Sequence, residues 1–240
     1  MNATSAHPSN ETQASANTAT RDSTVLIWDA PVRVFHWLLA LCFAGAYATA
    51  EGESWRLLHV TLGYTLAGLV AFRIVWGFIG TRHARFSSFV KGPQAVTRYL
   101  RSLPSAEPEH HTGHNPAGAW AILGMLALAA AIATTGWMTY NDLAGEWAEE
   151  LHDAIAEGML VLVCLHIAAV VASSWLHREN LPRSMVSGHK KAPSSQGIRS
   201  TWRSIAVVLL VSVLAFWYWQ WRDSPSGYGR ATVTTTAHNG

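Results

Sequence analysis

The chain has 240 residues, of which 50% are hydrophobic and only 13% are charged, whereas about a quarter are charged in a typical soluble domain. The net charge of +2 gives no indication of nucleic-acid binding, and Cys42 and Cys164 form no C-x-x-C pattern, so a zinc ribbon and c-type haem attachment are unsupported. Tryptophan and histidine are abundant, with 12 residues of each, and tryptophan favours membrane interfaces.

Five apolar segments reach or approach the roughly 20 residues that an α-helix needs to cross the hydrocarbon of a bilayer. They cover residues 32–50, 55–80, 116–139, 147–175 and 202–221. The third has a clear helix start, because Asn115 can cap the helix and Pro116 suits its first turn. The pattern predicts an all-α integral membrane protein with five spans.

The segments outside these spans are polar. Residues 1–24 have almost nothing to bury, so we expect a disordered tail. The loop 81–115 is basic, with one weakly amphipathic piece near residues 86–103. In the loop 177–200, we expect the prolines and glycines to break any regular element.

The loop charges predict the orientation of the chain. The loops 81–115 and 177–200 carry five Lys or Arg residues each, whereas the turn 140–150 has four acidic residues and no basic one. The positive-inside rule then places the N-terminus in the cytoplasm and the C-terminus in the periplasm. The acidic turns are either solvated loops or a docking surface for a basic soluble partner.

Four histidines enter the spans, and an ionisable residue inside a membrane helix is a candidate functional residue. They are His36, His59, His152 and His166. His166 follows His152 by 14 residues, which corresponds to about 21 Å along nearly the same helix face. Matching the depths of the spans pairs His36 with His166 on the inner side and His59 with His152 on the outer side.

Paired imidazoles from facing helices can fill both axial positions of a haem iron, which then transfers electrons rather than binding substrate. Any one of these histidines alone is more often a hydrogen-bonded core residue. Four at matched depths favour two haems stacked across the bilayer. The alternative from another class is a His-lined metal or proton transporter, although the chain lacks the repeats and broken helices typical of transporters.

Two arginines lie where they could pair with propionates of the inner haem. Arg73 follows His59 by 14 residues, and Arg33 lies one turn before His36. Interfacial snorkelling of either side chain is the alternative. Among the other histidines, His177 is the reserve candidate for His166, and His114 is the reserve for His36.

Several motifs resemble those of bacterial cytochrome b561 and the b-type cytochrome subunits of nickel-iron hydrogenases. The resemblance covers roughly residues 25–190 and includes the His152–His166 spacing. The motifs are R-V-F-H-W at 33–37, H-V-T-L-G-Y at 59–64, F-R-I-V-W-G at 72–77 and G-H-N-P-A-G at 113–118.

The resemblance implies a four-helix transmembrane haem-binding bundle, to which this chain adds a fifth C-terminal transmembrane helix. The expected parts are a tail at 1–24, the cytochrome b561-like domain at 25–190, a linker at 191–201, the last helix at 202–221 and an exposed tail at 222–240.

The functional expectation is a multi-pass protein of the bacterial inner membrane that holds two haems b per chain. It would transfer electrons between a periplasmic hydrogenase or c-type cytochrome and the quinone pool. The alternative within this chemistry is a superoxide oxidase that reduces ubiquinone.

Overall fold

The computed structural model describes residues 23–103, 105, 109 and 111–223. Within these residues, five helices are long and apolar enough to cross a membrane, as the sequence predicts. They are α2 (Ala30–Ala48), α3 (Arg56–Ile79), α6 (Pro116–Tyr140), α7 (Glu146–Leu176) and α9 (Arg203–Asp223). The fold is an all-α membrane bundle.

The helix starts follow from local chemistry. Asp29 caps α2 by accepting a 2.8 Å hydrogen bond from the amide of Val32, and Asn115 caps α6 through a 2.7 Å bond from Gly118. In each helix a proline occupies the first turn, where its missing N–H costs nothing. The Asn115–Pro116 start is therefore confirmed.

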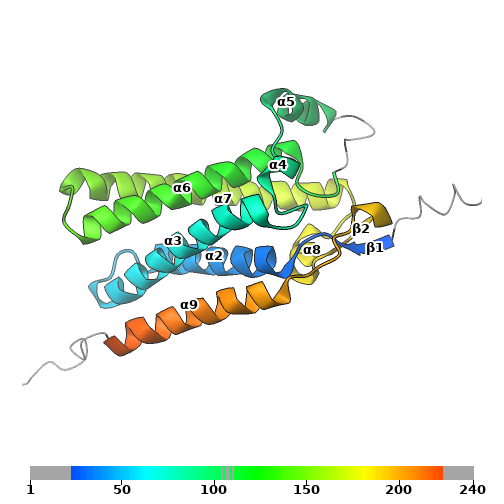
Figure 1. Ribbon diagram of the computed structural model, residues 1–240. Coiled ribbons are helices and arrows are strands. Elements are labelled where there is room, and N and C mark those ends of the chain that lie inside the picture. Colours follow the sequence, from blue (N-terminus) through cyan, green and yellow to red (C-terminus); the bar gives the residue numbers. More distant parts are fainter. Residues whose placement is uncertain (1–22, 104, 106–108, 110, 224–240) are drawn as a thin grey trace, which may run out of the picture.

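Helices α6 and α7 form one antiparallel hairpin, and α2 and α3 form another (Figure 1). Helix α3 packs on α6, while α7 packs chiefly along α6. Helix α9 lies against α2 and α3 at the edge of the bundle, where the indole of Trp217 donates a 2.9 Å hydrogen bond to the hydroxyl of Thr65. The fifth helix is thus part of the packed bundle.

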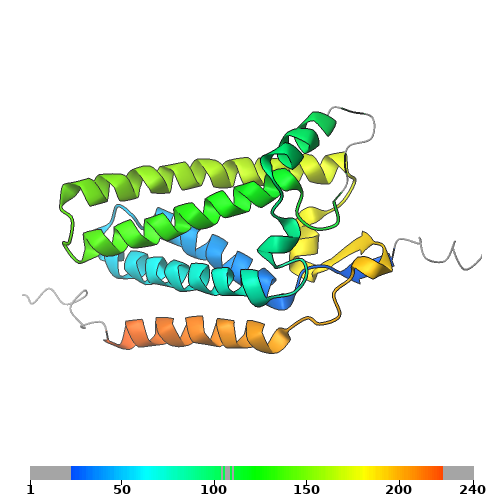
Figure 2. The same ribbon diagram turned by 45° about the horizontal axis from the view of Figure 1, so that its top comes forward.

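The short elements gather at one end of the bundle, together with the basic loops (Figure 2). We call this the basic end, and we call the opposite end, with the turns 49–55 and 141–145, the acidic end. The elements at the basic end are β1 (Ser23–Leu26), α4 (Phe86–Phe89), α5 (Pro93–Ser102), α8 (Leu181–Ser187), β2 (His189–Ala192) and the 3-10 turn η2 (Ser194–Gln196). A second 3-10 turn, η1 (Glu53–Trp55), precedes α3 at the acidic end.

Strands β1 and β2 pair in antiparallel register, with Ser23 opposite Ala192 and Leu26 opposite His189. The expected N-terminal tail therefore ends earlier than residue 24, because Ser23 and Thr24 belong to β1. Residues 1–22 and 224–240 of the two expected tails lie outside the described residues.

The expectation that no regular element forms within 177–200 is wrong. Helix α8 and strand β2 both lie there. The prolines and glycines that suggested irregular structure lie at or near the ends of these two elements. Asn180 caps α8 by accepting a 2.8 Å bond from the amide of Arg183, and Pro182 fits the first turn. Gly188 ends the helix with a φ of +85°, a conformation that favours glycine.

The middle of the bundle is apolar. One buried cluster joins all four helices of the two hairpins and contains Phe43, Leu66, Ala129 and Met159. It separates the level of His59 and His152 from the level of His36 and His166. The ionisable side chains are therefore confined to the two ends.

Candidate functional site

The acidic end brings the side chains of His59 of α3 and His152 of α7 together. Their ring centroids are 6.2 Å apart, and the rings are inclined at 72°. Two metal–nitrogen bonds of about 2 Å, plus roughly 1 Å from each nitrogen to its ring centroid, would separate two axial imidazoles by about 6 Å. The spacing of this pair fits a six-coordinate iron between the rings.

Hydrogen bonds define the tautomers of this pair. Nδ1 of His59 donates to the carbonyl of Ala46 at 2.9 Å, and Nδ1 of His152 lies 3.1 Å from the carbonyl of Ile132 and 3.1 Å from the hydroxyl of Thr135. A carbonyl can only accept, so each Nδ1 carries the hydrogen and each Nε2 keeps its lone pair. Such a bond at the second ring nitrogen is typical of histidines that bind metals.

Glycines provide space around these rings. A Cβ at Gly136 would lie 2.9 Å from Cε1 of His152, so α6 needs a glycine there for the ring to pack against it. A Cβ at Gly63, one turn after His59, would meet no described atom within 4 Å. The open space beside Gly63 leaves room for a flat ring next to His59.

At the basic end, His36 of α2 and His166 of α7 lie close enough for a charge on one imidazole to repel a charge on the other. Nδ1 of His36 is buried and has no hydrogen-bond partner among the described residues. This pair therefore differs from the pair at the acidic end, whose Nδ1 atoms both have partners. An unpartnered buried nitrogen costs free energy unless a bound group satisfies it.

Arg73 is a deeply buried charged side chain near this pair, with 3% of its surface exposed. Its Nη2 donates to the carbonyl of Ala84 at 3.0 Å, and its guanidinium lies 4.8 Å from the ring centre of Phe86. Its Nη1 is buried and has no partner among the described residues. An anionic group such as a propionate would complete its hydrogen bonding.

Arg33 also has a buried nitrogen without a hydrogen-bond partner among the described residues. Its Nη1 donates to the carbonyl of Val186 at 2.6 Å, while its buried Nε has no partner within the described part of the chain. The sequence predicted that both arginines could pair with propionates, with snorkelling as the alternative, and in the structure each keeps a buried nitrogen without a partner among the described residues.

Sequence reasoning missed a buried carboxylate that organises this end. Oδ2 of Asp29 accepts hydrogen bonds from the indole of Trp76 at 3.1 Å and from the hydroxyl of Thr81 at 2.6 Å, in addition to capping α2. Its negative charge attracts Arg73. Asp29 therefore links the start of α2 to the end of α3, where Arg73 lies.

His114, the reserve for His36, lies between two aromatic rings, with centroid distances of 4.6 Å to Trp28 and 4.7 Å to Phe89. Burial, assisted by the positive charges of Arg73 and other basic side chains, lowers the pKa of His114 to about 3. Its Nδ1 is buried without a hydrogen-bond partner in the described residues. His114 is thus a neutral ring near the second histidine pair.

His177, the reserve for His166, ends α7 and lines a small polar pocket together with Tyr99, Glu109 and Lys190. This polar environment favours His166 over His177 as the partner of His36. Among the described residues, no three His, Cys, Asp or Glu side chains form a group that could hold a metal ion. A haem needs only two protein ligands, which is what each histidine pair offers.

Comparison with known proteins supports this chemistry. The family model described as prokaryotic cytochrome b561 matches residues 27–188. No solved structure matches the chain.

Among curated proteins, a probable Ni/Fe-hydrogenase B-type cytochrome subunit of Rhodobacter capsulatus is 26% identical over 218 residues, which cover 71% of this chain and 82% of that protein. The protein with the same printed name from Cupriavidus necator is 28% identical over 209 residues, covering 68% of this chain and 86% of that protein. A probable Ni/Fe-hydrogenase 1 B-type cytochrome subunit of Escherichia coli is 27% identical over 142 residues, or 48% of this chain and 60% of that protein.

Proposed function

The chain belongs to the prokaryotic cytochrome b561 family, and from that premise we propose that it is a di-haem b-type cytochrome that carries electrons across the membrane. Its redox partners would be a periplasmic hydrogenase and the quinone pool. One observation carries the di-haem proposal. Helix α7 holds a histidine at each of two depths, and each lies near a histidine of another helix: His152 near His59, and His166 near His36.

Haem b, when bound between two imidazoles, supplies a one-electron redox couple with no free axial position for substrate. His59 and His152 would ligate the haem at the acidic end through Nε2, with Nδ1 held by the carbonyls of Ala46 and Ile132. His36 and His166 would ligate the haem at the basic end. Arg33 and Arg73 would donate to its propionates through the nitrogens that lack protein partners.

The partner proposal rests on the relatives, whose printed names describe them as cytochrome subunits of Ni/Fe-hydrogenases. The orientation proposal rests on the loops: the basic loops share one end of the bundle, which we assign to the cytoplasm. The N-terminus would then be cytoplasmic and the C-terminus periplasmic. The acidic end would face a periplasmic partner.

The test is the haem content of the full-length protein purified from membranes with an adequate supply of haem. Pyridine haemochrome quantitation should give two haems b per chain, and zero or one would contradict the proposal. The exposed histidine His189 of strand β2 offers a control, because His189→Ala should keep both haems. Reduction by hydrogenase with H₂, compared with reduction by superoxide, separates the electron-transfer proposal from the superoxide-oxidase alternative.

A further inference from the structure

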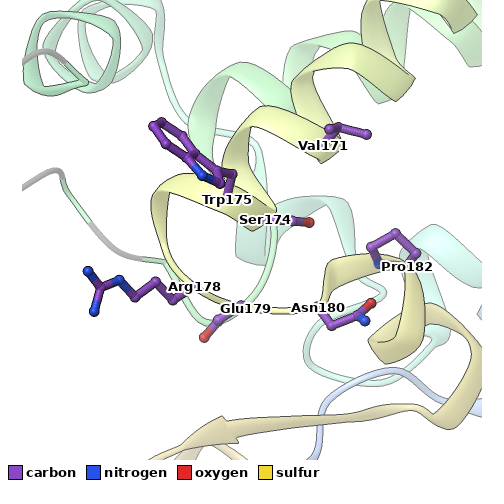
Figure 3. Close-up of a pocket in the computed structure, with 7 residues that line it drawn as sticks. All are labelled: Val171, Ser174, Trp175, Arg178, Glu179, Asn180 and Pro182. Carbon is purple, nitrogen blue, oxygen red and sulfur yellow. The ribbon is translucent and has the colours of Figure 1, made fainter.

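A groove at the basic end lies outside both histidine pairs. It has a volume of about 420 Å³ and lies between the end of α7 and the start of α8 (Figure 3). The residues that line it are Val171, Ser174, Trp175, Arg178, Glu179, Asn180 and Pro182.

The local backbone makes the groove. Arg178 has a φ of +51°, which turns the chain sharply after α7. The hydroxyl of Ser174 then accepts a 3.4 Å hydrogen bond from the amide of Leu181 in the first turn of α8. The two helix ends are thereby held as walls of one surface depression.

The residues of α7 that line the groove change in character along the helix axis. Val171 and Trp175 are spaced by four residues, so they follow one side of α7, and Arg178 comes directly after the end of the helix. Val171 is 60% exposed and Trp175 is 84% exposed. In a bilayer, valine suits the acyl chains, tryptophan suits the interface, and an arginine one turn further out reaches the phosphate level.

The charge of the groove is positive. Its one carboxylate, Glu179, is half-buried and forms a 2.9 Å ion pair with the buried ammonium of Lys190. The guanidinium of Arg178 is exposed and makes no ion pair or hydrogen bond with other described side chains. The surrounding segment 177–203 has six Lys or Arg residues and only this one acidic residue.

We propose that this groove binds an anionic phospholipid. The phosphate pairs with Arg178, the glycerol region packs on the indole of Trp175, and one acyl chain runs along Val171. The order of Val171, Trp175 and Arg178 along the chain matches the order of acyl chain, glycerol and phosphate in a lipid.

The experiment uses the full-length protein with its haem in an uncharged detergent. Its thermal midpoint is measured while phosphatidylglycerol or phosphatidylcholine of identical acyl chains is added. A lipid that binds only the folded protein raises this midpoint. Phosphatidylglycerol should raise it at lower concentration than phosphatidylcholine, and an equal response to the two lipids would overturn the proposal.

Two variants locate the effect. Arg178→Gln should weaken the response to phosphatidylglycerol roughly tenfold, because one charge-assisted contact is lost. Arg203→Gln is the matched control, because Arg203 is exposed at the start of α9 and does not line the groove. If both variants lose the preference equally, only the general charge of this end attracts the lipid, and the proposed site is wrong.

Two further arms separate the alternatives. Inorganic phosphate should leave the midpoint unchanged, and an Arg178-dependent shift with phosphate would show a site for free anions instead. If Arg178→Gln does not fold, the lipid preference can still be tested on the unmodified protein, by native mass spectrometry with an equimolar mixture of the two lipids. Retention of phosphatidylglycerol over phosphatidylcholine is expected, and equal retention contradicts the inference.

Discussion

The two histidine pairs are built differently, although α7 contributes a residue to each. At the acidic end, the ring centroids of His59 and His152 are 6.2 Å apart, and carbonyls satisfy both Nδ1 atoms. At the basic end, His36, Arg33 and Arg73 each keep a buried nitrogen without a partner in the described chain.

The difference shows two ways to prepare a cofactor site. The acidic end orients its ligands in advance through hydrogen bonds between helices. The basic end keeps unsatisfied donors whose desolvation penalty an anionic group would relieve. Removal of a haem should therefore disturb the basic end more, since no protein acceptor there replaces the propionates.

The largest expected effect comes from removing the ligands themselves. Replacing either His59 or His152 by alanine should reduce the haem content from two per chain to one and remove the same spectral component. Replacing His36 or His166 should remove the other component. Pyridine haemochrome quantitation and redox titration give the readout, and loss of different components from His59→Ala and His152→Ala would show that the pairing is wrong.

A smaller change at the acidic end should act on one haem only. In Gly136→Ala, the new Cβ would lie 2.9 Å from Cε1 of His152, so the ring must move. We expect partial loss of this haem and an altered spectrum for the remainder. Gly124→Ala on the same helix is the matched control, because its Cβ would meet Leu162 at an ordinary 3.5 Å. Equal spectra for both variants would contradict a close fit around His152.

The charges outside the two pairs offer a test of which end meets a soluble partner. Changing Glu146, Glu149 and Glu150 together to glutamine should slow haem reduction by a basic c-type cytochrome or by the hydrogenase several-fold at low salt. The salt dependence of the rate should weaken as well. Glu109→Gln at the basic end is the control. An unchanged rate and salt dependence in the triple variant would place docking elsewhere.

The buried arginine should tune the potential of one haem. Arg73→Gln removes a positive charge that favours the reduced form, so the midpoint potential of the haem at the basic end should fall by roughly 50–100 mV. Arg33→Gln should have a smaller effect, because Arg33 is less deeply buried. Potentiometric titration measures both, and a shift confined to the other haem would contradict the assignment of these arginines.

The smallest expected effect concerns His114. Its folded-state pKa is about 3, below the ordinary 6.5, so between these values the unfolded chain binds more protons. The stability from the neutral ring is present above about pH 6.5 and is lost as the pH falls toward 3. The slope is at most about 1.4 kcal/mol per pH unit.

His114→Phe keeps a planar ring that does not titrate. The decrease in thermal midpoint between pH 7.5 and pH 5.5 should therefore be smaller in this variant than in the parent protein. Thermal unfolding followed by circular dichroism measures the difference. An identical pH dependence would mean that folding does not lower the pKa of His114.

The sequence by itself determined the membrane class, the five spans and the family, because long apolar runs and spaced histidines are local features of the chain. It also contained a signal that was missed. In an antiparallel hairpin, residues equidistant from the turn face each other. This rule places Thr135 opposite His152 and Ala46 opposite His59. In the structure, Thr135 contacts Nδ1 of His152, and the carbonyl of Ala46 contacts Nδ1 of His59.

Only the tertiary structure decided what surrounds the second pair. The burial of Arg73, its attraction to Asp29 and the donors left on Arg33 and Arg73 depend on loops that return from distant parts of the sequence. The same holds for α8, which the sequence had suggested to be irregular. Hydropathy specifies which segments enter the membrane, whereas the satisfaction of each polar atom depends on which segments meet, and packing alone settles that.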